Sequence, residues 1–538
     1  MPAVSRAAPC AVSRAASRPV SGYARCTLSL LSLSYAALAC LCMLPAEVRA
    51  FGFADVAAKA KALAASAFQA PSADLPKELR DLAYERYRTI RYRPEARQWR
   101  GLPFELAFFH PGWHFDLPVK INEVAGGVRE LKFDPQAFDY AGVKVDPAQL
   151  RKLGPAGFQI LFPINSAKVK DEVLAVLGAS YFRALGREQR YGASARGLAL
   201  DVAAQTGEEF PRFVEFWLER PAAGARELIF YALLDSKSAA GAYRFVFTPG
   251  VSTSMDVKAQ LYFRDGVSKL GKVGLAPLTS MFFSGENQRQ GGDDYRPEVH
   301  DSDGLSVHAG NDEWIWRPLV NPKRLLVTSF STTDPRGFGL MQRDRSFGDY
   351  QDLEQRFELR PSVWVQPKGK WGAGRIELVQ IPAPDETNDN VVAYWVRDKA
   401  PASGKPLDLE YRLLWEKERE TRPPLAEVQQ TRRGRGFPRG ADNSIGLAID
   451  FDGGPKAEAK AEASAKSEGE KLPTAQVWSD ANGQILEQAV VPNAATGGWR
   501  LHLRLKQVDE AKPVELRATL RDGARPVSET WSYILPPL

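Results

Sequence analysis

From Tyr87 almost to the C-terminus, short strand-like runs alternate with Gly, Pro and Asp turns, and this pattern constrains the fold most. The runs are rich in aliphatic, β-branched and aromatic side chains, which suit a pleated, half-buried surface. Many strands with few helices favour an antiparallel sandwich over a doubly wound sheet, so we predict an all-β fold. The clearest runs in the first 400 residues are Phe104–Phe109, Gly157–Phe162, Phe213–Leu218, Leu228–Leu234, Tyr243–Thr248, Leu325–Phe330, Ile376–Ile381 and Val391–Val396.

Three segments are predicted to be helical against this background. The Ala- and Lys-rich stretch Ala54–Phe68 has helical spacing, and a second helix is expected to begin near Asp74. A third is expected from Ser166, a plausible N-cap, to Leu185. Its apolar stripe consists of Val169, Val173, Val176 and Leu177. No Gly-rich phosphate loop occurs in the sequence, which argues against a nucleotide-binding protein.

Shifts in composition divide the chain into predicted domains. Residues 51–416 are expected to form a large β-sandwich, and residues 417–440, dense in charge, Pro and Gly, are expected to form a hinge. Residues 441–538 contain short strands with a turn every eight to twelve positions, which is typical of a small immunoglobulin-like sandwich. Inside it, the low-complexity Ala/Lys/Glu stretch 453–473 is predicted to be a flexible insertion.

The first 50 residues are typical of a secretion signal. Arginines without acids precede the apolar run Leu28–Leu44, and Val48-Arg49-Ala50 resembles a cleavage site, so the mature chain is expected to start near Phe51. All four cysteines lie in this segment, and a mature chain without thiols suits an oxidising compartment. The alternatives are an uncleaved anchor and lipidation at Cys40. No later apolar run reaches about 18 residues, so no stable membrane insertion is expected after cleavage.

The net charge of +6 does not indicate a polyanion-binding protein. Residues 1–50 hold five arginines and one glutamate, so the rest of the chain is close to neutral. The basic cluster Arg432–Arg439 is more simply explained as part of a solvated linker. We therefore predict no nucleic-acid partner.

Paired carboxylates are the chemistry that the sequence supports best. The chain lacks a G-x-S-x-G elbow and an H-E-x-x-H helix, and its histidines have no local support for a triad. A metal site is an alternative, but its ligands would lie in one turn-like loop, so we predict no metal and no cofactor. The ligands in that alternative would be His300, Asp301, Asp303 and His308.

Two segments are dense in acids, and glycoside hydrolysis needs two carboxyl groups. The first runs from His300 to Glu313 and the second from Asp385 to Asn390, just before a predicted strand. Turn formation is the alternative explanation, because Asp and Asn are common in turns. The residues alone do not choose Asp301 over Asp303, or Asp389 over Asp385.

Aromatic rings near these acids favour a carbohydrate ligand, because a sugar offers hydroxyls to carboxylates and an apolar face to rings. In a strand, Trp314 and Trp316 would share one face with Asp312. Core packing is the alternative for each tryptophan. The predicted substrate-binding residues are His300, Asp303, His308, Asp312, Trp314, Trp316, Arg317, Asp385, Glu386 and Tyr394.

Five stretches resemble the periplasmic glucan biosynthesis protein G/D family, whose members serve osmoregulated periplasmic glucans. They span nearly the whole mature chain in order, and only the insertion 453–473 looks foreign to the family. The stretches are FELAFFHPGWHFDLPVKINEV (104–124), GASYFRALGREQRYGASARGLALD (178–201), YRPEVHDSDGLSVHAGNDEWIWRPL (295–319), DETNDNVVAYW (385–395) and SETWSYILPP (528–537).

The resemblance implies a large galactose-mutarotase-like β-sandwich followed by a small immunoglobulin-like sandwich. It implies a periplasmic protein that acts on β-1,2-linked glucan chains, some members of the family resembling inverting β-1,2-glucanases with two aspartates. Carried over by motif, these are Asp301 in HDSDG and Asp389 in DETND. The leader has no Arg-Arg pair, which favours the G branch over the twin-arginine-exported D branch.

Three functions remain open from the sequence. The first is cleavage or remodelling of a β-1,2-glucan backbone by the two aspartates. The second is a non-catalytic glucan-binding factor that assists an inner-membrane glucan synthase. A third, an epimerase or lyase, rests on analogy of fold alone.

Overall fold

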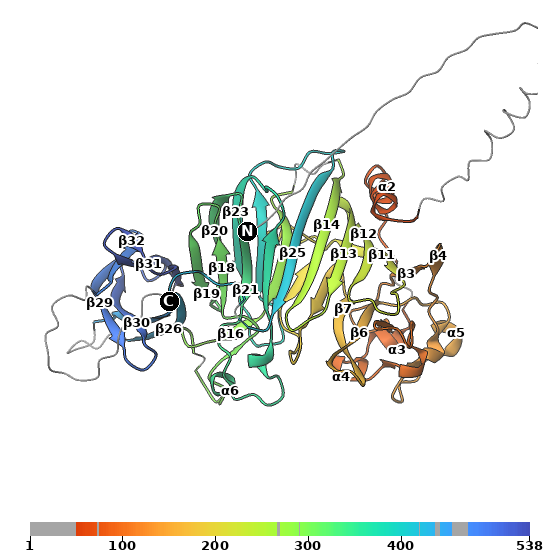
Figure 1. Ribbon diagram of the computed structural model, residues 1–538, viewed down its shortest axis with the longest axis horizontal. Helices are drawn as coiled ribbons and strands as arrows, with labels where there is room; N and C mark the ends of the chain where they lie inside the picture. Colours follow the sequence, from red (N-terminus) through yellow and green to blue (C-terminus); the bar gives the residue numbers. More distant parts are fainter. Residues whose placement is uncertain are drawn as a thin grey trace, which may run out of the picture. The chain divides into compact units, whose positions relative to one another are not determined.

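Strands dominate the structure, a computed structural model, and the prediction of an all-β fold is confirmed (Figure 1). It describes residues 50–72, 75–265, 270–289, 291–418, 420–435, 442–453 and 472–537. The predicted signal segment, apart from Ala50, lies outside the described residues, as does most of the predicted insertion 453–473. The mutarotase-like and immunoglobulin-like assignments and the domain boundaries stay predictions.

The larger sheet contains 15 strands among the described residues. Its main path in space is β28 (Thr474–Ser479), β31 (Val514–Asp522), β33 (Thr530–Leu535), β19 (Trp314–Pro318), β18 (Gly304–His308), β21 (Gly337–Met341), β22 (Ser362–Pro367), β25 (Leu407–Glu416), β14 (Thr253–Phe263), β13 (Ala239–Thr248), β12 (Leu228–Asp235), β11 (Arg212–Glu219), β3 (Lys120–Val124) and β4 (Val128–Glu130), and β32 (Arg525–Pro526) pairs with β31. Most neighbours are antiparallel, but β19 pairs with β33, and β3 with β11, in parallel.

A second sheet of ten described strands faces part of the first. Its path is β2 (Glu105–Phe109), β6 (Gly157–Ser166), β7 (Val169–Leu177), β8 (Tyr181–Ala184), β9 (Ser194–Arg196), β15 (Val273–Ser280), β24 (Val391–Arg397), β23 (Ala373–Gln380) and β20 (Leu326–Thr333), with β10 (Leu198–Leu200) on β15. Phe158 of this sheet packs edge-on against Phe216 and Phe230 of the larger sheet, at 5.0 and 5.9 Å. The main hydrophobic core therefore lies between two sheets, as in a sandwich.

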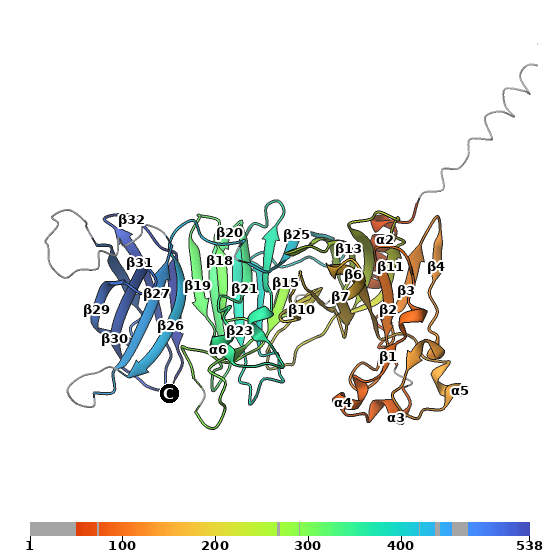
Figure 2. The same cartoon turned by 60° about the horizontal axis from the view of Figure 1, so that its bottom comes forward.

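A second core joins the C-terminal strands to the larger sheet. The four-stranded sheet β26 (Glu427–Arg435), β27 (Ile445–Asp452), β30 (Gly498–Gln507) and β29 (Gly483–Asn493) contributes Leu501, and the larger sheet contributes Trp531 and Trp316. Because β33 pairs with β19, the small sandwich shares a sheet with the large one. Figure 2 shows the blue C-terminal strands next to β19. Within the predicted hinge 417–440 the structure forms β26, which pairs with β27, and the hinge itself stays a prediction.

The helices are few and short. The first is α2 (Phe53–Ala64), as predicted, and its Val56, Ala57 and Ala60 pack on the outer face of β11 to β13 (Figure 1). In place of one second helix the chain forms two single turns, α3 (Lys77–Arg80) and α4 (Tyr84–Tyr87). The other described helical segments are α5 (Pro147–Leu150), α6 (Phe347–Tyr350), η1 (Pro94–Ala96), η2 (Pro135–Ala137) and η4 (Phe357–Leu359). Two short strand pairs lie outside the large sheets: β1 (Arg91–Tyr92) with β5 (Phe138–Asp139), and β16 (Phe282–Ser284) with β17 (Val299–His300).

The predicted helix from Ser166 to Leu185 is wrong, because this segment forms the second strand of the β6–β7 hairpin and then β8. The three valines in the segment are β-branched, which favours strand over helix. Ser166 does cap a local structure, but it is the hairpin turn: its hydroxyl accepts a hydrogen bond from the N–H of Lys168 at 3.2 Å.

Candidate functional site

Two acidic segments that are far apart in the sequence meet at the dipeptide Met281–Phe282. The N–H of Asp301 donates to the carbonyl of Met281 at 2.9 Å. Next to Asp389, the Asn390 amide accepts from the N–H of Phe282 and donates to its carbonyl, both at 2.9 Å. The structure therefore places the HDSDG and DETND segments on the same two residues.

Asp301 is a buried member of an ion pair. Its carboxylate contacts the guanidinium of Arg360, and its side chain is 7% exposed. Arg360 follows η4 and lies over the ring of Phe357, 4.1 Å from its centroid. Burial and the nearby Arg183 lower the pKa of Arg360 to about 9, whereas Asp389 raises it. Arg360 therefore contacts one aspartate and lies within electrostatic range of the other.

Asp389 has a more open environment. Its side chain is 31% exposed, and its Oδ2 lies 3.2 Å from Nη2 of Arg183. The Nε of Arg183 donates to the hydroxyl of Ser194 at 2.5 Å, which fixes the guanidinium on β8. Two carboxylates in different environments are what acid–base chemistry requires of a pair.

Two other predicted residues in the second segment have structural partners. Glu386 forms a two-point ion pair with Arg296, at 2.9 and 2.7 Å. Arg296 also contacts Asp352 at 3.1 Å. Asp385 is exposed and accepts hydrogen bonds from the N–H and hydroxyl of Thr387, so it stabilises the turn.

The tryptophans of β19 pack into the second core rather than against Asp301. Trp316 is buried, and the guanidinium of Arg343 lies 3.6 Å from its ring centroid. Trp314 stacks on Trp364 at 5.7 Å and on His308 at 4.2 Å.

The remaining predicted residues also have protein partners. Arg317 is fully buried and pairs with Glu515, and Tyr394 is fully buried and donates to Glu377 at 2.8 Å. The exposed side chain of Asp312 pairs with Arg336, and its Oδ1 lies 3.3 Å from Nε2 of His308. These contacts favour structural roles for this group.

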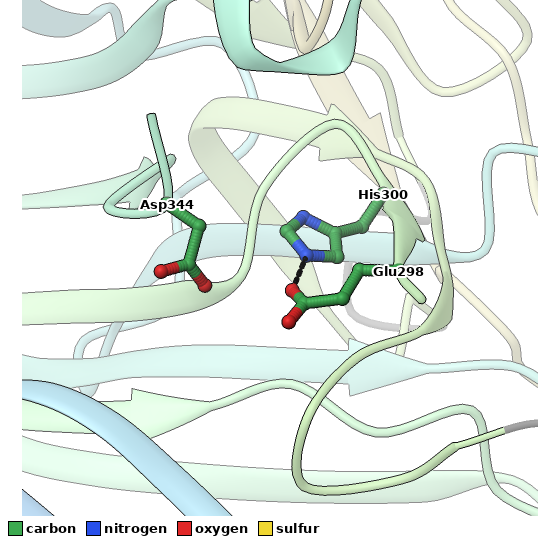
Figure 3. A group of neighbouring side chains, drawn as sticks. All are labelled: Glu298, His300 and Asp344. Atoms are coloured by element: carbon green, nitrogen blue, oxygen red, sulfur yellow. Dashed lines mark hydrogen bonds and ion pairs between the residues drawn. The ribbon is translucent and has the colours of Figure 1, made fainter. Parts of the chain in front are cut away.

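His300, which directly precedes Asp301 in the sequence, belongs to a buried cluster with Glu298 and Asp344 (Figure 3). Its Nδ1 donates to Oε1, the side-chain amide oxygen of Gln342, at 2.9 Å, and its Nε2 lies 3.0 Å from Oε2 of Glu298. Burial alone would lower the pKa of His300, but the Glu298 carboxylate raises it above the usual range. The contact with Glu298 therefore favours the protonated form of the imidazole.

Among the residues that the structure describes, these three form the group that could hold a cation, since one ligand atom from each lies within 4.8 Å of the others. This set differs from the alternative considered from the sequence, because Asp301 faces Arg360 and His308 stacks on Trp314. Asp303 lies beside the cluster: its Oδ2 accepts from the N–H groups of Arg343 and Asp344 at 2.7 and 3.0 Å.

The cluster contains more acids than it can keep ionised. Burial, followed by repulsion from Glu286 and Asp303, raises the pKa of Asp344 well above its usual range. Burial and then Glu298 raise the pKa of Glu286 to about 8. Protons therefore stabilise this part of the fold at neutral pH.

We expect the variant Glu286→Gln to gain stability relative to the wild type as the pH rises. The folded protein keeps a proton on Glu286 up to about pH 8, whereas the unfolded chain releases it near pH 4.5, so the wild type loses stability between these values. The relative gain is expected to be on the order of 4 kcal/mol between pH 5 and pH 8.5. Thermal melts across this pH range measure the effect, and Glu85→Gln, at an exposed position, is the control. If the melting temperatures of Glu286→Gln and the wild type changed in parallel with pH, Glu286 would not be the proton-binding group.

A large pocket extends from Arg183 toward the N-terminal region. Its volume is about 1350 Å³, and Tyr84 and Tyr87 line it together with Arg183 and Ser194. Burial raises the pKa of Glu172, another lining residue, to about 7. Since Arg183 also contacts Asp389, the pocket adjoins the second acidic segment.

Sequence reasoning missed the arginines and the inner acids of this site. Arg183 and Arg360 come from β8 and the end of η4, and nothing in their local sequence indicates which aspartate each one faces. Glu298 could have been found, because it lies two positions before His300 and alternation along a strand places both on one face.

Fold and site together define an all-β protein in which the segments of Asp301 and Asp389 meet at Met281–Phe282 and each aspartate pairs with an arginine. Residues 51–535 match the family described as "Periplasmic glucan biosynthesis protein, MdoG". The chain belongs to this family, and the predicted resemblance is confirmed. The family description implies the periplasm, and no described helix has the length and apolarity needed to span a bilayer.

Curated relatives support the same assignment. The chain is similar to "Glucans biosynthesis protein G" of Ralstonia nicotianae, with 59% identity over 91% of this chain and 96% of the relative. The protein of the same description from Pseudomonas aeruginosa is 49% identical, over 92% and 95%. That from Pectobacterium atrosepticum is 47% identical, over 96% and 98%.

Proposed function

We propose that the protein binds β-1,2-linked glucan and cleaves or remodels its backbone by an inverting mechanism with Asp301 and Asp389. The observation that carries the proposal is the meeting of their two segments at Met281–Phe282, with one carboxylate buried and the other open. The family description supports a glucan as the ligand. The β-1,2 linkage rests on the motif resemblance.

The two environments suggest a role for each aspartate. Asp301 lies in a buried ion pair with Arg360, which favours a carboxylate and therefore the base. Asp389 is more open and is assigned as the acid. As a water molecule attacks the anomeric carbon, Asp301 takes a proton from that water. The glycosidic C–O bond breaks, and the leaving oxygen receives the proton of Asp389.

The pocket next to Asp389 supports binding of a chain rather than a single sugar. Its volume of about 1350 Å³ exceeds the usual range for small-ligand sites, and tyrosines and polar groups line it together. Tyr84 is half exposed and offers a ring face, while Arg183 and Gln159 offer donors for hydroxyls.

Arg360→Gln is expected to slow cleavage by about a hundred-fold, because the side chain orients Asp301 through their ion pair. Turnover of linear β-1,2-glucan measures the effect, and Arg129→Gln on β4 serves as the control because Arg129 pairs with Glu123 instead. Wild-type turnover by Arg360→Gln would remove this arginine from the mechanism.

A second candidate function is a non-catalytic glucan-binding factor that assists an inner-membrane glucan synthase. It is favoured by the fact that both aspartates are paired with arginines, an arrangement that also suits a site built only for binding. In that case Arg183 and Arg360 would hold hydroxyls and neutralise the aspartates.

The test is incubation of the purified protein with linear β-1,2-glucan, followed by chromatography and NMR of the anomeric proton. New shorter chains with an inverted anomeric configuration support the first function. Tight binding in calorimetry without any product at high protein concentration supports the second and overturns the first. An unsaturated or epimerised product would indicate a lyase or an epimerase.

A further inference from the structure

A second groove lies on the small sandwich, where β28 and β31 meet the turn before β19. Its volume is about 610 Å³, and Asp301, Asp389 and the arginines that pair with them are not among its lining residues. We propose that this groove binds a further segment of a glucan chain, separately from the site around Asp301 and Asp389. The choice of glucan as ligand rests on the proposed function.

A half-exposed tryptophan is the central feature of the groove. Burial alternates along β28, so Gln476 and Trp478 point outward while Ala475 and Val477 face the second core. The indole of Trp478 is 52% exposed. An isolated aromatic ring on a sheet face offers a flat apolar surface for the C–H face of a pyranose.

Polar side chains surround this ring on the same face. In the β28–β31 register, Trp478 lies opposite Arg517 and Gln476 lies opposite Thr519, which brings each pair's side chains together. Arg521 of β31 also lines the groove. An amide, a hydroxyl and two guanidinium groups beside one ring match the hydroxyls at the edge of a sugar.

The turn before β19 forms the opposite wall. The carboxylate of Glu313 lies 2.7 Å from Arg517 and accepts from the hydroxyl of Thr530 at 2.8 Å, so the wall is fixed to the sandwich. Asp312 and Trp314, predicted from sequence to bind substrate, line this second groove rather than the first. Their placement offers a physical explanation for why acids and rings are adjacent in this stretch.

A sugar chain suits the groove better than other ligands. Carboxylates and guanidinium groups face it together, so it lacks the single sign of charge that a nucleic acid requires. Trp478 is the more exposed of the two rings that line it, and Trp314, Leu425 and two prolines lie among its polar groups. Flat apolar surface mixed with hydrogen-bonding groups suits a sugar chain. A volume of about 610 Å³ falls within the range of small-ligand sites.

A second binding site would act on long chains through effective concentration. A chain long enough to reach both sites gains affinity from the second contact without any new contact at the first. A short oligosaccharide occupies one site at a time and gains nothing. Chain length therefore separates the two sites experimentally.

Calorimetry with long linear β-1,2-glucan and with a short β-1,2-oligosaccharide tests the proposal on the full chain. We expect Trp478→Ala to weaken binding of the long glucan by about tenfold or more and to leave cleavage of the short one unchanged. Trp478→Phe keeps a ring and should retain most of the affinity. Val491→Ala, at a 38% exposed position on β29, is the matched control.

Each other outcome overturns the proposal in a recognisable way. Wild-type affinity of Trp478→Ala for the long glucan excludes the groove as a glucan site. Equal loss for long and short chains makes it part of the first site. Unchanged glucan binding with loss of glucan production in cells indicates a protein partner instead. If the wild type binds no β-1,2-glucan, the proposed function fails, and β-1,3- and β-1,6-glucans become the probes. Binding of one of these glucans that depends on Trp478 keeps the groove as a glucan site. No binding of either glucan rejects the groove as a glucan site.

Discussion

Asp301→Asn and Asp389→Asn are each expected to slow cleavage of linear β-1,2-glucan by about a thousand-fold or more, with glucan affinity nearly unchanged. Asparagine keeps the size of the side chain but neither takes a proton from water nor gives one to the leaving oxygen. The ion pairs with Arg360 and Arg183 would be lost, but the hydrogen bonds that the Asp301 N–H and the Asn390 side chain form with Met281–Phe282 would remain. The loss should therefore appear in kcat rather than in binding.

The matched control is Asp385→Asn, in the same turn as Asp389. Asp385 is exposed and accepts its hydrogen bonds from Thr387, so asparagine should preserve both the turn and the activity. Reducing-end assays over long incubations would measure all three variants, with calorimetry for affinity. Equal turnover by the wild type and the Asp301→Asn variant would remove this pair from the chemistry.

Double replacement of Asp301 and Asp389 also separates the two proposed functions. If cleavage is the cellular role, the double variant should fail to restore glucan production in a deficient strain. If binding is enough, the variant should restore it. Full complementation would therefore favour a factor that guides chains from a synthase.

The sequence predicted most strands because alternation and turn residues are local signals. It failed at residues 166–185, where an apolar spacing compatible with a helix is carried by valines that prefer a strand. It also gave no sign of β26 within residues 417–440, since charged residues are as common on an exposed strand as in a linker. The sharing of one sheet by both sandwiches depends on a parallel pairing between β19 and β33, which no local pattern encodes.

The candidate site was predictable only in part. Dense acids indicated both segments, and the family motif singled out Asp301 and Asp389. Their partners Arg360 and Arg183 were not predictable, because these contacts join segments far apart in the chain. The tryptophans show another limit: spacing placed Trp314 and Trp316 on one strand face, but it could not show that this face packs on the second core or that Trp314 also lines the second groove.

The second core contains a buried ion pair whose loss should have the largest effect on stability. Arg343 and Glu529 are both buried, with Nη1 and Oε1 2.6 Å apart. Nη1 of Arg343 also donates to the carbonyl of Val428 at 2.6 Å, and Glu529 accepts from the N–H of Val428 at 2.7 Å. The pair thus connects the loop after β21 to β26 and to the segment before β33.

Glu529→Ala is expected to lower the free energy of unfolding by about 3–5 kcal/mol, because it removes the carboxylate that lies 2.6 Å from the buried guanidinium of Arg343. Chemical denaturation measures the change, and Glu85→Ala, which breaks an exposed pair with Arg88, should leave the midpoint unchanged. The double variant Arg343→Met/Glu529→Leu should be more stable than Glu529→Ala, since it also removes the buried positive charge and fills the space. If Glu529→Ala unfolded at the wild-type midpoint, or if the double variant were the less stable of the two, the buried charge would not be the source of the stability.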